Sequence, residues 1–193
     1  MSIETHGRKN VEVFNDVARL DVNGESVRAR LVVDCMGFGS PIVRQIRGDR
    51  KPDGVCVVVG SCAEGFDEND SADLIYTCTD IEEDYRGQYF WEAFPASSGP
   101  TDRTTYMFTY MDADEARPSI SSMLDDYWEY MPKYQGLDSI DDIEFKRVLF
   151  GMFPTFRDSP LQTEFDRILQ IGDASGIQSP LSFGGLAALL RHM

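Results

Sequence analysis

The chain has 193 residues, of which 42% are hydrophobic and 11% aromatic, a composition typical of a globular protein with a sizeable core. It carries 18 basic and 33 acidic residues, a formal charge of −15, which argues against nucleic-acid binding because phosphate contacts need clustered Lys and Arg. No apolar run approaches the roughly 18 residues that a membrane span needs, and the first residues lack the apolar segment of a secretory signal.

The first 54 residues alternate apolar and polar side chains, which predicts antiparallel strands near 10–15, 17–22 and 26–34. Asn23-Gly24 is a hairpin signal between the second and third of them. The third strand ends in an all-apolar stretch, typical of a strand buried on both faces of a parallel sheet. A turn and a short helix follow, with Ser40 as the expected cap.

The middle of the chain predicts an antiparallel sheet. Its four expected strands, separated by Gly, Asp, Ser and Pro clusters, lie at 55–62, 72–80, 87–95 and 104–112. Apolar residues at helical spacing then predict a helix within 118–134, and a turn and a further strand are expected within 139–154.

The last part predicts a second buried strand at 167–173 and the start of a helix near 184. The order is therefore buried strand, long antiparallel insertion, helix, buried strand, helix, which indicates an α/β fold interrupted by a β-rich lobe. We expect domain segments at 1–54, 55–149 and 150–193, the first and last belonging together.

Cysteine and histidine usage argues against a metal centre. No two cysteines form a Cys-x-x-Cys pair, and the chain has only two histidines, so neither a zinc site nor a histidine-dependent hydrolase is expected. Most of the cysteines lie in strand-like apolar runs, where buried reduced thiols are the simplest interpretation and indicate a reducing compartment. The cysteines are Cys35, Cys56, Cys62 and Cys78.

The segment from 172 to 185 has the composition of a ligand-binding junction. Asp173 follows a predicted buried strand at its carboxyl end, where ligands of open α/β sheets bind, and a carboxylate there suits a ribose or polyol hydroxyl. Gly184 and Gly185 open the next helix and would let a ligand approach the backbone closely. The alternative is a plain turn in which the aspartate caps a backbone amide.

The stretch GDASGIQSPLSFGG resembles the second flavin motif of the FAD-dependent group that includes aromatic hydroxylases, geranylgeranyl reductases and lycopene cyclases. In that group the aspartate binds the ribityl chain of FAD and the helix start faces the flavin ring, so the resemblance implies these roles here. The matching positions are Gly172, Asp173, Ala174, Pro180, Gly184 and Gly185.

A second stretch, VVDCMGFGSPIVRQI, resembles another segment of the same group that borders the FAD. Cys35 replaces the usual alanine of that segment. The matching positions are Asp34, Gly37, Ser40 and Arg44.

A third stretch, QYFWEAFP, resembles the lipid-facing strand of geranylgeranyl reductases and the Phe-Leu-Glu-Glu-Thr segment of plant-type lycopene cyclases. The resemblance implies that Tyr89, Trp91 and Phe94 face the substrate and that Glu92 serves as an acid, although Ala93 stands where the cyclases have their second glutamate. The alternative of equal weight is an amphipathic strand whose aromatics lie in the core.

The resemblance implies a partial FAD/NAD(P)-binding (three-layer) domain with an inserted antiparallel substrate lobe, and an FAD-dependent oxidoreductase acting on an isoprenoid, such as a carotenoid, or a similar apolar substrate. NADPH as reductant, peripheral contact with a membrane surface, and a plastid location in a plant (otherwise the cytoplasm) follow from the same resemblance. The chain lacks the Gly-x-Gly-x-x-Gly motif that binds the pyrophosphate, and it corresponds to the later two-thirds of a family member. The alternative is therefore a truncated, flavin-free fragment without catalytic activity, at most a binding or interaction module.

Overall fold

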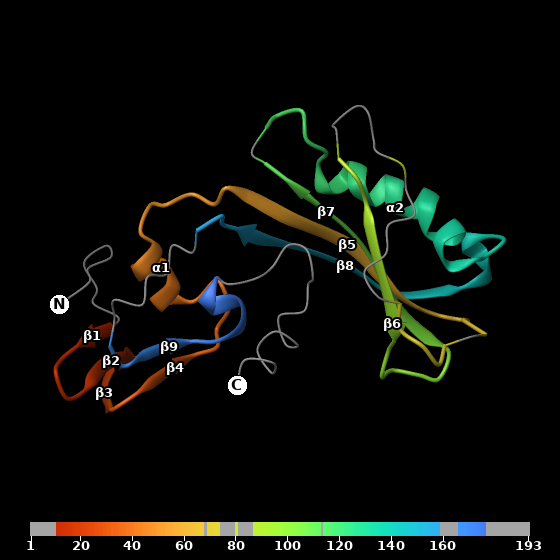
Figure 1. Cartoon of the computed structure of the whole chain (residues 1–193). Coiled ribbons are helices and arrows are strands. Elements are labelled where there is room, and N and C mark those ends of the chain that lie inside the picture. Colours follow the sequence, from red (N-terminus) through yellow and green to blue (C-terminus); the bar gives the residue numbers. More distant parts are fainter. Residues whose placement is uncertain are drawn as a thin grey trace. The chain divides into compact units, whose positions relative to one another are not determined.

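The structure is a computed structural model that describes residues 11–67, 69–73, 80, 87–112, 114–158 and 166–176. The chain divides into two compact units (Figure 1). Unit 1 consists of Met1–Asp53 and Pro154–Met193, and unit 2 is Gly54–Phe153. These boundaries lie one and four residues from the expected ones, after residues 54 and 149. The cofactor-binding and substrate-binding roles expected of the two units stay predictions.

Unit 1 begins with an antiparallel meander of β1 (Val11–Val13), β2 (Ala18–Val22) and β3 (Glu25–Ala29). Asn23 and Gly24 join β2 to β3 with positive φ angles of 55° and 86°, the backbone conformation that a two-residue hairpin turn requires. The Asn-Gly hairpin prediction is therefore confirmed.

The single strand expected over 26–34 is wrong, because the chain changes sheets there. After β3 it leaves the meander, and β4 (Val32–Asp34) pairs in parallel with β9 (Ile168–Gln170). The guanidinium group of Arg167 donates to the Arg30 carbonyl at the break, with an N···O distance of 3.2 Å, and Val32 N–H donates to the Arg167 carbonyl at 2.9 Å. This long-range anchor accounts for the break.

Arg167 also reaches the meander. Its guanidinium group donates to the carbonyl oxygen of Phe14 at 3.3 Å and to that of Asn15 in the turn that follows β1. One side chain therefore ties the start of β9 to two separate points of the N-terminal segment.

Unit 2 is built on a four-stranded sheet in the order β6-β7-β5-β8, in which β5 and β6 both pair antiparallel with β7 (Figure 1). All four of its strands lie where the sequence predicted strands, β8 being the one expected within 139–154, and most of the additional strand expected at 72–80 lies outside the described residues. The strands are β5 (Gly54–Glu64), β6 (Phe90–Pro95), β7 (Asp102–Met111) and β8 (Glu144–Thr155), with a short 3-10 turn, η1 (Ile140–Asp142), before β8.

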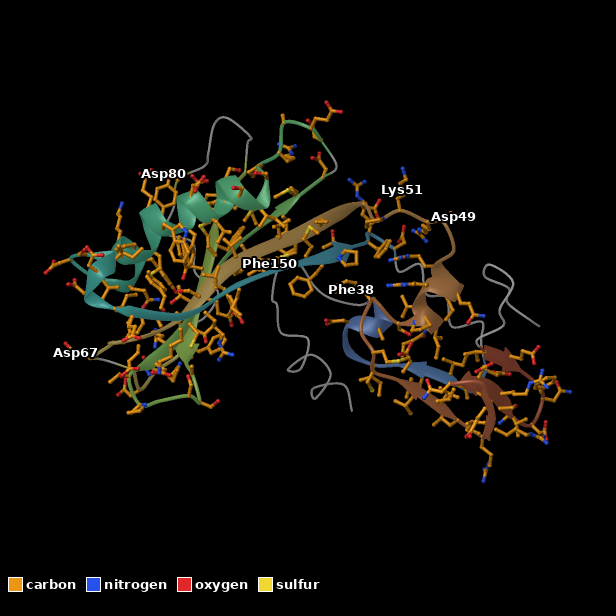
Figure 2. All side chains as sticks on the ribbon, turned by 180° about the vertical axis from the view of Figure 1, so that it is seen from behind. Phe38, Asp49, Lys51, Asp67, Asp80 and Phe150 are labelled. Carbon is orange, nitrogen blue, oxygen red and sulfur yellow. The ribbon has the colours of Figure 1, made fainter. Side chains whose placement is uncertain are left out.

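Helix α2 (Ile120–Gln135) packs on this sheet and confirms the helix expected within 118–134. Ser119 caps its start by accepting a hydrogen bond from Ser122 N–H, and Gly136 ends it in the left-handed conformation. Side chains of the helix and sheet fill the space between them (Figure 2). The fully buried members of this core are Val59, Tyr89, Trp91, Met107, Met123, Tyr127 and Met131.

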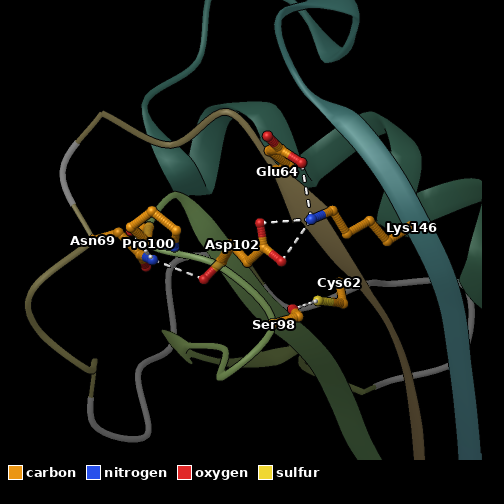
Figure 3. Close-up of polar contacts among 7 residues, drawn as sticks. All are labelled: Cys62, Glu64, Asn69, Ser98, Pro100, Asp102 and Lys146. Atoms are coloured by element: carbon orange, nitrogen blue, oxygen red, sulfur yellow. Dashed lines mark hydrogen bonds and ion pairs between the residues drawn. The ribbon is translucent and has the colours of Figure 1, made fainter.

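At one end of this sheet, a buried carboxylate is held by a lysine (Figure 3). Lys146 Nζ lies 2.9 and 2.7 Å from the two carboxylate oxygens of Asp102 and 2.8 Å from Glu64 Oε2. The hydrogen bond from Lys146 lowers the pKa of Asp102. The network therefore ties β8 to the start of β7 and the end of β5.

We predict that Lys146→Met lowers the free energy of unfolding at neutral pH. Because the folded pKa of Asp102 is depressed, its stabilising contribution is present above the pKa of the unfolded chain, about 3.9, and is lost as pH falls through the lower folded value. The difference between wild type and variant should therefore shrink below about pH 4. Urea unfolding between pH 7 and pH 3 measures it, with Lys51→Met at an exposed lysine as the control, and a pH-independent difference would contradict the assignment.

We also predict that Arg167→Ala destabilises unit 1, because three backbone carbonyls lose a charged hydrogen-bond donor. The groups are partly solvated, so we expect a loss of about 1–2 kcal/mol in urea unfolding. Arg28→Ala is the control, since Arg28 is exposed and its guanidinium group lies 4.0 Å from the carboxylate of the exposed residue Asp16. Equal effects of the two substitutions would show that Arg167 is not an anchor.

Candidate functional site

The parallel pairing of β4 and β9 brings together two segments far apart in the sequence. Asp34 is the register partner of Gln170, so the carboxyl ends of both strands lie at one edge of the sheet. Three residues further on each chain segment, a Cβ added to Gly37 would lie 3.8 Å from the Cβ of Asp173. The two stretches that resemble flavin motifs therefore meet in space.

Asp34 is buried, and both of its carboxylate oxygens are engaged within its own turn. Oδ1 accepts from Met36 N–H at 3.0 Å, and Oδ2 accepts from the Ser40 hydroxyl at 2.7 Å. Ser40 in turn caps α1 (Pro41–Arg47) by accepting from the N–H groups of its first turn, at 3.0 and 3.3 Å. The direct contribution of these two side chains is thus to hold the strand–turn–helix in shape.

The turn itself needs a glycine at position 37. Gly37 has a φ of +70°, and its carbonyl accepts a hydrogen bond from Ser40 N–H at 3.0 Å. Arg44, the last matched residue of this segment, is exposed in the final turn of α1. Its predicted role at the cofactor stays a prediction.

On the other strand, β9 runs into a short 3-10 turn, η2 (Gly172–Ser175), in which Gly172 has a φ of +65°. Ala174 is fully buried and packs against Val43 of α1. Asp173, which is partly buried, is therefore fixed in a tight turn at the strand end. The remaining predicted cofactor residues, Pro180, Gly184 and Gly185, lie outside the described residues.

The predicted substrate strand, β6, divides its side chains between the two faces of the sheet. Tyr89, just before it, and Trp91 are fully buried in the core beneath α2. The Trp91 ring stacks on Tyr127 and Tyr134, with ring centroids 5.8 and 4.8 Å apart. For Tyr89 and Trp91, this burial favours the core alternative over a substrate-facing role.

The alternation of a strand places Glu92 and Phe94 on the opposite face. Glu92 is the register partner of Tyr106 on β7, and Phe94 meets the Tyr106 ring edge-on at a centroid distance of 5.7 Å. Phe90 and Phe108 stack at 5.7 Å on the same face. Desolvation by these surroundings raises the pKa of Glu92, which favours its protonated form more than at an exposed site. We call this surface the aromatic face.

The sequence did not single out the β7 side of the aromatic face. The alternation of TTYMFTYMD predicts a strand, but the rings that lie opposite Glu92 are defined only by the register with β6.

A buried thiol also lies in this sheet: burial raises the pKa of Cys56 to about 11, so it is protonated at neutral pH and a poor nucleophile. Among the residues that the structure describes, no cluster of acidic, Cys and His side chains could hold a metal ion.

Neither the protein-family models nor the curated proteins give a match to this chain. Solved structures of flavin enzymes do match it in fold. It aligns over 94% of its length with the flavin-dependent halogenase CmlS, at a TM-score of 0.61 and 20% identity, and over 95% with a flavoprotein/dehydrogenase from Cytophaga hutchinsonii, at 0.56 and 16%. It aligns over 89% with p-nitrophenol 4-monooxygenase PnpA from Pseudomonas putida DLL-E4, at 0.52 and 12%.

These similarities define the class of fold: the chain has part of the fold of FAD-dependent flavoprotein oxidoreductases, and the predicted α/β fold with an inserted antiparallel lobe is confirmed. The chain spans only 33%, 45% and 42% of the lengths of the halogenase, the dehydrogenase and the monooxygenase. No helix among the described residues is long and apolar enough to cross a membrane.

We predict that Gly37→Ala destabilises the chain by about 1 kcal/mol, because a Cβ disfavours the positive φ of the turn. The space beside Gly37 is open enough for a methyl group, so the cost is conformational and not a clash. Gly39→Ala is the control, since its added Cβ meets nothing within 4 Å and its φ is not in the left-handed region. Urea unfolding compares the two, and equal stabilities would contradict the prediction.

Proposed function

We propose that this chain is the part of an FAD-dependent oxidoreductase that holds the ribityl side of the flavin and one wall of the substrate site. The observation that carries the proposal is the pairing of β4 with β9, which brings the Gly37 turn beside Asp173 at the strand ends. The similarity in fold to flavin-dependent enzymes supports it.

The residues at this edge fit a flavin cofactor by their chemistry. A carboxylate at the carboxyl end of a parallel strand accepts hydrogen bonds from polyol hydroxyls, and Asp173 supplies one. Gly37 has no side chain, so a ligand beside Asp173 could approach the backbone of this turn closely. A bound flavin would supply the redox chemistry, and this chain's residues would bind and orient it.

The aromatic face supports an apolar substrate. Its rings come from two adjacent strands and surround one carboxyl, that of Glu92, whose raised pKa suits a proton donor. We therefore propose Phe94 and Glu92 as substrate-facing residues, and an isoprenoid of the lycopene-cyclase or geranylgeranyl-reductase type as the substrate class. NADPH as reductant, contact with a membrane surface and a plastid location belong to the same proposal.

The second candidate function is that of a flavin-free binding module. The absence of Gly-x-Gly-x-x-Gly from the chain favours it, because that motif holds the pyrophosphate of FAD. The internal hydrogen bonds of Asp34 favour it as well, since the matched turn has a structural reason to exist without a ligand.

The deciding experiment is titration of the purified chain with FAD, followed by flavin fluorescence and by absorption after gel filtration. We predict that wild type binds FAD and that Asp173→Ala weakens the affinity at least about tenfold, equivalent to about 1.4 kcal/mol. Asp49→Ala, at an exposed aspartate, is the matched control.

An unchanged affinity in Asp173→Ala would remove that residue from the site. If the wild-type chain is incubated with excess FAD and then elutes from gel filtration without flavin absorption, the result would instead favour the flavin-free module.

A further inference from the structure

Strand β8 forms one edge of the sheet in unit 2, and within the described part of the chain no strand pairs with its outer side. It is twelve residues long, whereas β6 at the opposite edge has six. A long edge strand presents a row of backbone N–H and C=O groups to any further strand of matching register.

The middle and C-terminal part of β8, from residue 148 to 153, is also apolar, and alternate residues of it are exposed. Val148, Phe150 and Met152 alternate along the strand, with exposed fractions of 48%, 70% and 54% (Figure 2 labels Phe150). Alternate residues share one face of a strand, so these three form an apolar row, which we call the β8 row. Single exposed apolar residues are ordinary, but three on the same face of an unpaired edge strand are unusual.

Edge strands are normally protected by charge or proline, and this protection is weak within the β8 row. Residues 148–153 contain no charged side chain. Of the two cations just before them, Lys146 is held by Asp102 and Glu64 and Arg147 is exposed, and Pro154 comes only after them. An uncharged segment of high β-propensity on an edge is the kind of sequence that pairs with another strand.

We propose that the occupant of this edge is the β8 strand of a second copy of the chain, paired antiparallel about a two-fold axis at Phe150. In that register Val148 of one copy lies opposite Met152 of the other, and Phe150 lies opposite Phe150. Lys146 and Arg147 fall opposite Pro154 and Phe153, so no like charges face each other. The segment is complementary to itself.

The net charge of the chain leads to a second prediction about the same interface, namely how dimerisation depends on salt. Two chains of formal charge −15 repel each other, and salt screens that repulsion. The dimer should therefore become tighter as NaCl is raised from about 50 to about 500 mM, over which the screening length falls about threefold. An interface held by ion pairs would respond in the opposite direction.

Sedimentation equilibrium of the 193-residue chain tests the proposal, with a species of twice the 21.8 kDa chain mass as the expected result. Phe150→Lys places two like charges at the axis and should raise the dimer dissociation constant at least about tenfold. Phe14→Lys, the same exchange at another exposed phenylalanine, should leave the constant unchanged. Circular dichroism confirms that each variant is folded.

Mixing Phe150→Lys with Phe150→Glu tests the register, because only a pairing centred on this residue sets the two opposite charges against each other. Restored dimer in the mixture supports the proposal. A wild-type chain that stays monomeric, a dimer that Phe150→Lys leaves intact, or a mixture that stays monomeric would each overturn it.

Discussion

The parallel pairing of β4 with β9 is the constraint on which unit 1 depends. Each strand has only three residues, and they come from positions more than 130 apart in the sequence. So short a pair has little stability by itself. Further hydrogen bonds secure it at both ends: Val32 N–H to the Arg167 carbonyl before the pair, and Ile171 N–H to the Asp34 carbonyl after it.

This pairing also explains how unit 1 can present a site. It aligns the carboxyl ends of two strands and sends each into a tight turn that contains a glycine of positive φ, Gly37 on one side and Gly172 on the other. Ala174 then packs against Val43, so that the second turn is fixed on the helix that follows the first. Unit 2 is organised differently. One face of its sheet packs against α2 to form the core, and the other carries the aromatic rings near Glu92.

Local patterns in the sequence predicted what local forces determine. The Asn23-Gly24 hairpin and helix α2 depend on turn chemistry, apolar spacing and caps, all of which can be read from neighbouring residues. The break after β3 depends on Arg167, which is 137 residues from Arg30 along the chain, and no local pattern indicates it. The aromatic face escaped prediction for the same reason, because register decides which side chains of two strands share a face.

The two matched aspartates show why resemblance to a motif predicts a fold more safely than a ligand. Asp34 ends one strand of the parallel pair and Asp173 lies just beyond the other. Both carboxylate oxygens of Asp34, however, accept hydrogen bonds from its own turn and from the hydroxyl that caps α1. A turn of that kind requires its aspartate, glycine and serine whether or not a cofactor is present. The match at Asp34, Gly37 and Ser40 is therefore explained by the architecture, and the case for a flavin in this chain depends on Asp173.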